Sequence, residues 1–317
     1  MNEFSLIDVF FKKPAISRDD VIYGIGDDAA CLQIPPGQQL FVTTDTLVAE
    51  VHFLSIWDPF DIAFKAVMVN VSDIAAMAAT PCWASLALTI PEYNFNWLSR
   101  FSEGLQAALG QFGISLIGGD TSRGPLSITL TMHGMAPVGK GVRRKGAKPG
   151  DIIWVSGELG AAALAVSFLQ RQDIDAADRV ILMKKLQHPQ ARVDLMPILQ
   201  RFATAAIDIS DGLAADLNHI CEAGELGACL SLADIPVHPL VSKYQGDKAI
   251  DFSISGGDDY ELCFSTPADS RDELFASLRE SGLSCYAIGV IEETPGLRAI
   301  IAAGDVIALA ATGFSHF

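Results

Sequence analysis

Residues 83–133 read WASLALTIPEYNFNWLSRFSEGLQAALGQFGISLIGGDTSRGPLSITLTMH. The first eight residues of this stretch are mostly apolar and are bounded by prolines, which is typical of a buried strand. Over residues 95–112 apolar side chains recur every three or four positions and predict a helix. Residues 114–117 and 126–133 predict two more strands, with a Gly-Gly-Asp turn after the first of them. This mixture of strands and helix predicts an α/β (mixed α+β) fold.

The same mixture of strands and helices extends outward in both directions. Upstream, residues 39–44 predict a strand and residues 60–79 a helix. The basic, glycine-rich stretch 139–150 predicts a boundary between two domains, 1–148 and 149–317. Downstream we expect strand 152–156, a helix after Gly157, helix 174–201, strand 205–209, helix 213–223, a strand pair within 250–265, helix 269–282 and strand 284–291.

Composition limits the classes of function. The chain has 317 residues, of which half are hydrophobic, and 22 basic against 38 acidic residues give a net charge of −16. Such a charge repels nucleic acid and anionic membranes, so we expect neither as a partner. Charged residues interrupt the longest apolar stretches, which argues against a membrane span. The six cysteines form no paired motif, and we interpret them as small core residues of a cytoplasmic protein.

Aspartates recur in short motifs at the ends of expected strands and in glycine turns. Each motif is flanked by apolar sequence, which ties its carboxylate to the core. Carboxylates gathered in one cleft would repel one another unless hard cations such as Mg²⁺ lay between them, and Mg²⁺ commonly completes its shell with substrate phosphates. The motifs are Gly26-Asp27-Asp28, Thr43-Thr44-Asp45-Thr46, Asn70-Val71-Ser72-Asp73, Gly118-Gly119-Asp120-Thr121, Asp208-Ile209-Ser210-Asp211-Gly212 and Gly256-Gly257-Asp258-Asp259.

These motifs have two other interpretations. Ser-Asp or Asp before a helix is commonly a helix cap, and Asp-Gly is commonly a turn, so each motif alone has a purely structural explanation. Gly24-x-Gly26-x-x-Ala29 also matches a dinucleotide fingerprint. That fingerprint must open a helix, whereas Pro35 and Pro36 follow closely and two aspartates would face the phosphates.

Taken in order, these motifs closely resemble the thiamine-monophosphate kinase family, within the superfamily of aminoimidazole ribonucleotide synthetase and selenophosphate synthetase. The resemblance runs from Phe4 to Phe317 and includes Gly146-Ala-Lys-Pro-Gly-Asp151 and Ser255-Gly-Gly-Asp-Asp-Tyr-Glu-Leu262. It implies a two-domain fold, in which residues 1–148 bind ATP and magnesium and form the dimer, and residues 149–317 form an α/β domain. It also implies direct transfer of the ATP γ-phosphoryl group onto thiamine monophosphate, several Mg²⁺ ions and a homodimer.

The resemblance assigns roles to particular positions. For magnesium it implies Asp28, Thr43, Thr44, Asp45, Asp73, Asp120, Asp208 and Asp211. For ATP it implies Gly119, Asp120, Arg144 and Ser210. For thiamine monophosphate it implies His52, Asp258 and Phe314, and it implies no covalent nucleophile. Two positions depart from the usual family pattern, since Asp258 replaces a glutamate and Phe314 replaces a tyrosine or tryptophan.

Rival functions differ in what they require of the sequence. Selenophosphate synthetase needs an N-terminal cysteine or selenocysteine, and residues 1–25 contain no cysteine. The hydrogenase-maturation relative needs a C-terminal cysteine, and this chain ends Gly-Phe-Ser-His-Phe. Spacing alone does not separate aminoimidazole ribonucleotide synthetase. A metal-dependent binding protein without turnover also remains an alternative.

Overall fold

The computed structural model describes residues 3–12, 18–169, 174–301 and 303–315. The chain divides into two compact units, each with its own sheet. Unit 1 consists of Met1–Ile74 and Ala79–Lys140, and unit 2 of Ala75–Ala78 and Gly141–Phe317. Within the described ranges, no helix has both the length and the apolar content needed to cross a membrane.

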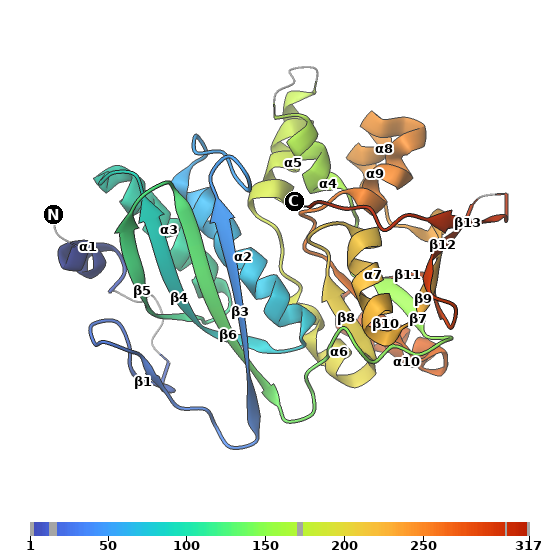
Figure 1. Ribbon diagram of the computed structural model, residues 1–317, viewed down its shortest axis with the longest axis horizontal. Helices are drawn as coiled ribbons and strands as arrows, with labels where there is room; N and C mark the ends of the chain where they lie inside the picture. Colours follow the sequence, from blue (N-terminus) through green and yellow to red (C-terminus); the bar gives the residue numbers. More distant parts are fainter. Residues whose placement is uncertain (1–2, 13–17, 170–173, 302, 316–317) are drawn as a thin grey trace. The chain divides into compact units, whose positions relative to one another are not determined.

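Unit 1 is built on a four-stranded sheet with the strand order β3-β6-β4-β5 (Figure 1). Strand β6 pairs antiparallel with β3 and with β4, and β4 pairs parallel with β5. A short β1–β2 pair lies outside this sheet. The elements are α1 (Glu3–Phe10), β1 (Val21–Tyr23), β2 (Cys31–Leu32), β3 (Gln38–Val48), α2 (Pro59–Ala76), β4 (Thr80–Ile90), α3 (Phe95–Gln111), β5 (Ser115–Arg123) and β6 (Ser127–Pro137).

Helices α2 and α3 lie against one face of this sheet (Figure 1). Strand β6 alternates accordingly, with Ile128, Leu130 and Met132 buried and the threonines between them partly exposed. The two helices approach so closely that a Cβ on Gly104 of α3 would lie 2.2 Å from the Phe60 carbonyl oxygen of α2. The helical spacing predicted for α3 is confirmed, and Asn94 caps the helix by accepting the Trp97 N–H at 3.1 Å.

The prediction of a turn at 118–120 is wrong, because these residues continue strand β5. Gly118, Gly119 and Asp120 pair in parallel register with Ser85, Leu86 and Ala87 of β4. Gly119 has φ +151°, and a Cβ there would lie 1.8 Å from the Leu86 carbonyl oxygen. The glycine therefore allows β5 to stay paired through a close approach that any side chain would block.

Unit 2 has a seven-stranded sheet of order β13-β12-β9-β11-β7-β10-β8, flanked by helices (Figure 1). Strand β10 is antiparallel to both β7 and β8. The elements are β7 (Ile152–Val155), α4 (Ala161–Ser167), α5 (Ala176–Gln187), η1 (Val193–Leu195), α6 (Met196–Phe202), β8 (Ala205–Asp208), α7 (Leu213–Gly224), β9 (Gly227–Ser231), η2 (Leu232–Asp234), α8 (Pro239–Gln245), η3 (Gly246–Lys248), α9 (Ala249–Ser255), β10 (Leu262–Thr266), η4 (Ala268–Ser270), α10 (Arg271–Glu280), β11 (Tyr286–Glu292), β12 (Gly296–Ile300) and β13 (Val306–Leu309).

Two expectations for unit 2 are corrected. The single helix expected over 174–201 is interrupted between α5 and α6, because Pro189 disfavours helical backbone at the residue before it. The first strand expected within 250–265 is instead helix α9. Its buried residues Ala249 and Ser253 are four positions apart, which suits a helix. All six cysteines are free thiols, and five of them are buried.

Candidate active site

Unit 1 contains a pocket of about 670 Å³ beside the glycine-containing end of β5. Helix α1, residues 24–30 and Gly118–Thr121 line it, together with parts of β4. Its wall carries Asp27, Asp28 and Asp120, so two separate aspartate motifs of the sequence come together here. The volume lies within the range of small-ligand sites.

Two polar contacts made by residues of this pocket or next to it involve residues outside the predicted set. Ser122 Oγ donates a 2.6 Å hydrogen bond to Asp120 Oδ2. Lys12, which forms an ion pair with Asp8 at 2.9 Å, also lines the pocket, next to Gly26. Sequence reasoning missed Lys12 because it belongs to no motif, and only its position beside the aspartates draws attention to it.

A second acidic group in unit 1 joins β3 to α2. Thr43 Oγ1 donates to Asp73 Oδ2 at 2.5 Å, and the Asp45 N–H donates to Asn70 Oδ1 at 3.2 Å. Burial, and then the nearby Asp73 carboxylate, raise the pKa of Asp45 to about 6. The structure thus places two carboxylates from distant motifs close together, at an electrostatic cost to their charged forms.

Thr44 and His52 have other partners. Side chains alternate along a strand, so Thr44 points away from Thr43, and its Oγ1 lies 2.9 Å from Thr131 Oγ1 of β6. His52 Nδ1 accepts the Val48 N–H at 2.9 Å, which fixes the imidazole at the end of β3. Its Nε2 therefore carries the proton in the neutral form.

The unit 1 carboxylates suit a hard divalent cation that arrives with further ligands. Among the described residues, no group of three or more His, Cys, Asp or Glu side chains is arranged to hold a metal ion alone. Mg²⁺ typically uses one or two carboxylates and takes its remaining oxygens from water and substrate phosphates. Burial and the Asp73 carboxylate raise the pKa of Asp45, and a bound cation would favour its charged form.

In unit 2 the Ser210-Asp211-Gly212 turn packs directly on the Gly256–Asp259 turn. The Asp258 N–H donates to the Ser210 carbonyl at 2.8 Å, and the Tyr260 N–H donates to the Ile209 carbonyl at 2.8 Å. A Cβ on Gly257 would lie 2.4 Å from the Ser210 carbonyl oxygen, so glycine is required there. Asp208, at the end of β8, is buried next to this junction.

A buried carboxylate outside the predicted set supports the first of these turns. Asp216 is 2% exposed, and its Oδ2 accepts the N–H groups of Asp211 and Gly212, each at 3.0 Å. Burial raises its pKa to about 6 despite these hydrogen bonds. This role is hard to predict from the sequence, because an Asp in the first turn of a helix is common.

Phe314 and Asp258 lie at these turns, and the segment of Arg144 contacts β8, since the Ala206 N–H donates to the Arg143 carbonyl at 3.1 Å. The Phe314 N–H donates to the Asp211 carbonyl at 3.0 Å, and the residue remains 52% exposed. Asp258 and Tyr260 have φ of +70° and +51°, a left-handed conformation that costs non-glycine residues about 1–3 kcal/mol each. Arg144 is exposed in the basic segment, whose neighbour Val142 is buried.

Both units match known family models. Residues 26–136 match the AIR synthase related protein N-terminal domain, and residues 148–302 match the corresponding C-terminal domain. The thiamine-monophosphate kinase of Escherichia coli (strain K12) is 44% identical over 319 residues, covering 99% of this chain and 98% of the relative. The chain belongs to the thiamine-monophosphate kinase family. The Haemophilus influenzae member of this family is 42% identical over 100% of this chain and 98% of its own.

Solved structures of the same family share the fold. The thiamine-monophosphate kinase from Stenotrophomonas maltophilia K279a has a TM-score of 0.84 at 43% identity, covering 89% of this chain and 92% of that one. AaThiL complexed with AMPPCP and TMP has a TM-score of 0.80 at 29% identity, covering 90% and 89%. The predicted two-domain α/β fold is confirmed by these matches.

Proposed function

We propose that this chain transfers the γ-phosphoryl group of ATP directly onto the phosphate of thiamine monophosphate, giving thiamine diphosphate and ADP, the last step of thiamine diphosphate biosynthesis. The observation that carries the proposal is 44% identity, over almost the entire chain, with a thiamine-monophosphate kinase. The complex of AaThiL with AMPPCP, an ATP analogue, and TMP supports the same pair of reactants.

The chemistry requires little covalent participation by the protein. The acceptor is a phosphate monoester that is already ionised near neutral pH, so no general base is needed. The main obstacle is repulsion between two polyanions, and catalysis rests on position and electrostatic stabilisation. We therefore propose in-line transfer without a covalent enzyme intermediate or a protein nucleophile.

We propose that the acidic residues act through bound magnesium. When bound, Mg²⁺ would neutralise phosphate charge and stabilise the leaving oxygen. Asp45 and Asp73 would hold one cation between their carboxylates, and the pocket aspartates Asp28 and Asp120 would hold metal that arrives with ATP. The proposed set of magnesium-binding residues also includes Thr43, Thr44, Asp208 and Asp211.

The remaining site residues would orient the two reactants. Gly119 lines the unit 1 pocket and would contact ATP there, and Arg144 and Ser210 would contact ATP phosphates. Phe314 offers an exposed aromatic face on which the thiamine rings could stack, and His52 and Asp258 would lie next to thiamine monophosphate. Asp258 is one methylene shorter than the usual glutamate, so its contact would be correspondingly longer.

We also propose a homodimer that acts in the cytoplasm. Strand β3 exposes Leu40, Val42 and Val48 on the face of the unit 1 sheet opposite the helices. Apolar side chains in such a row are commonly covered in an oligomer. Light scattering coupled to size exclusion should give twice the chain mass, and a Val42→Lys substitution should shift it toward the monomer.

An assay with thiamine monophosphate, ATP and magnesium, followed by chromatography, tests the function. Thiamine diphosphate should accumulate in equal amount to ADP. A parallel assay of aminoimidazole ribonucleotide synthetase activity covers the rival within the superfamily. Calorimetric binding of ATP and magnesium without any product would instead favour a binding protein.

A further inference from the structure

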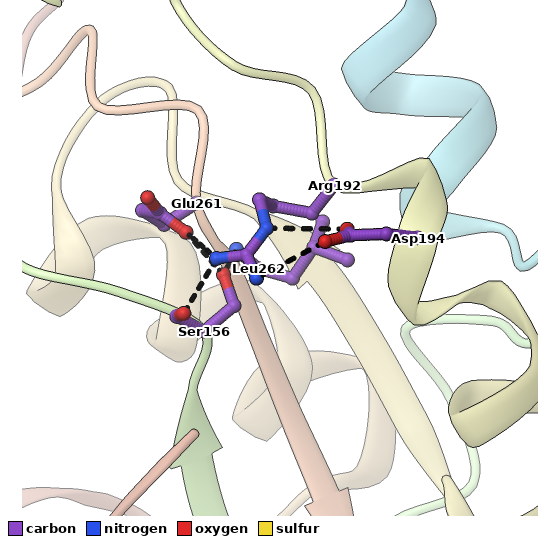
Figure 2. A network of polar contacts seen from close by, with 5 residues as sticks. All are labelled: Ser156, Arg192, Asp194, Glu261 and Leu262. Atoms are coloured by element: carbon purple, nitrogen blue, oxygen red, sulfur yellow. Dashed lines mark hydrogen bonds and ion pairs between the residues drawn. The ribbon is translucent and has the colours of Figure 1, made fainter. Parts of the chain in front are cut away.

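A buried ion pair in unit 2 fixes the start of β10. Glu261, 8% exposed, accepts hydrogen bonds from Ser156 Oγ at 2.5 Å and from Arg192 Nη1 at 2.7 Å (Figure 2). Arg192 Nη1 also donates to the Ser156 carbonyl oxygen at 2.5 Å. The Arg192 side chain is 13% exposed and also pairs with the more exposed Asp194 at 3.3 Å, as Figure 2 shows, while Arg192 supplies the positive charge beside the buried Glu261 carboxylate.

This pair joins the loop after β7 to the turn before β10. Ser156 Oγ accepts the Leu262 N–H at 2.7 Å, and the Ser156 N–H donates to the Leu262 carbonyl at 3.0 Å. A Cβ on Gly157 would lie 2.4 Å from Glu261 Oε1. The backbone of the loop therefore rests directly on the carboxylate, and any displacement of Glu261 displaces both segments.

A second carboxylate ties the same two segments together two residues earlier. Asp259 Oδ2 accepts the Gly160 N–H at 2.7 Å. Asp259 and Glu261 both reach the 156–160 loop, and the residues that alternate with them, Asp258 and Tyr260, are the two residues of this turn with positive φ. Left-handed backbone at non-glycine residues persists only where its surroundings hold it in place.

We propose that Arg192 and Glu261 are positioning residues, which hold the 256–261 turn against the 156–160 loop so that Asp258 is presented to thiamine monophosphate. This inference rests on the proposed function. The pair acts through the backbone conformation of the turn that carries Asp258.

The effect should be greater for one of the two reactants. Ser210, proposed to contact ATP, lies on a turn that accepts the Asp258 N–H but also has an anchor of its own, because Asp216 accepts two N–H groups from the residues that follow Ser210. Loss of the Arg192–Glu261 pair removes support from the Asp258 turn and leaves the Asp216 anchor intact. Displacement of a positioning group by about 1 Å commonly lowers rates by about 100-fold.

Four variants and wild type test the inference by steady-state kinetics and thermal melting. In Glu261→Gln we expect kcat/KM for thiamine monophosphate to fall by about 10- to 100-fold, with KM for ATP changed less than about twofold. Arg192→Lys should recover part of the loss seen in Arg192→Met, because it keeps one donor to the carboxylate. Arg201→Met is the matched control, since Arg201 forms a largely exposed ion pair with Glu273.

The double variant Arg192→Met with Glu261→Gln separates positioning from simple charge compensation. It leaves no buried lone charge, so its melting temperature should exceed that of Arg192→Met, while the defect toward thiamine monophosphate should persist. Two results would overturn the inference without affecting the proposed function. One is a loss of kcat/KM that is equal for both reactants and follows the melting temperatures, and the other is a Glu261→Gln variant with unchanged kinetics. If wild type forms no thiamine diphosphate, the proposed function fails and the inference fails with it.

Discussion

The hydroxyl of Thr43 on β3 donates a 2.5 Å hydrogen bond to the Asp73 carboxylate on α2. This bond joins a strand to a helix across thirty positions of sequence, and the same Asp73 carboxylate lies near Asp45. Burial and this neighbour raise the pKa of Asp45 to about 6. The two carboxylates thus carry unfavourable charge at neutral pH, which a divalent cation would relieve.

Asp45→Asn should abolish turnover, with a loss of at least about 100-fold in kcat, because it removes a proposed metal-binding oxygen. The fold should be preserved. In the absence of metal, the free energy of unfolding at pH 7 should stay equal or rise, by no more than about 3 kcal/mol, because a destabilised charge is gone. Kinetics and urea unfolding measure the two effects. Near-wild-type rates at ordinary magnesium concentrations would show that Asp45 does not bind the metal.

Asp120→Asn should also abolish turnover, and it should weaken magnesium-dependent ATP binding by at least about 10-fold, as Asp120 lines the unit 1 pocket. Ser122→Ala is the matched control. It removes the 2.6 Å hydrogen bond to Asp120 and keeps the carboxylate, so its effect should be much smaller. Titration calorimetry with ATP and magnesium compares the affinities of the two variants for ATP. Equal losses of affinity in both would show that the effect comes from altered local structure and not from loss of the carboxylate.

Gly119→Ala should destabilise the protein by about 2 kcal/mol or more, because its Cβ would lie 1.8 Å from the Leu86 carbonyl oxygen and its φ is +151°. Its neighbour offers a matched control. A Cβ on Gly118 meets no atom within 4 Å, so Gly118→Ala should change the free energy of unfolding by less than about 1 kcal/mol. Urea denaturation of both variants makes the comparison, and similar stabilities would contradict the β5 geometry.

Asp216→Asn should alter the dependence of stability on pH. The pKa of Asp216 rises to about 6 on folding, so between about pH 4 and pH 6 the folded chain holds this proton more tightly than the unfolded chain. The contribution of this group to the free energy of unfolding therefore falls by about 3 kcal/mol as pH rises through that interval. The variant should lack this decrease, as unfolding curves at several pH values would reveal.

The matched control for this pH effect is Asp269→Asn, at an exposed residue of η4. It should follow the wild-type pH dependence. A wild-type profile that Asp216→Asn leaves unchanged would show that the buried carboxyl has an ordinary pKa.

Phe314→Ala should raise KM for thiamine monophosphate by about 5- to 50-fold and leave KM for ATP nearly unchanged, since an exposed aromatic face is lost. Phe314→Trp should retain or improve affinity because the larger ring keeps that face. Steady-state kinetics with each reactant varied in turn measures both. Equal effects of the two substitutions would indicate that Phe314 serves packing only.

Local pattern was sufficient for much of the fold. The helical spacing of Leu98, Phe101 and Leu105 predicted α3, and the apolar run ending at Ile90 predicted β4, because each pattern reflects burial of one element. The same reasoning misread residues 118–120 and 250–255. Glycine occurs both in turns and where two strands approach closely, so 118–120 fit either. A segment as short as 250–255 fits a strand or a short helix equally well.

The sequence by itself determined the family, the order of the motifs and the acidic character of the proposed site, because these depend on residue identity and spacing along the chain. Tertiary structure decided which side chains meet. The pairing of Thr43 with Asp73, the anchor that Asp216 provides and the Arg192–Glu261 pair each join residues whose separation in sequence carries no signal. Their proximity results from packing of whole strands and helices, and burial at those contacts then shifts the pKa values of the carboxyl groups Asp45 and Asp216.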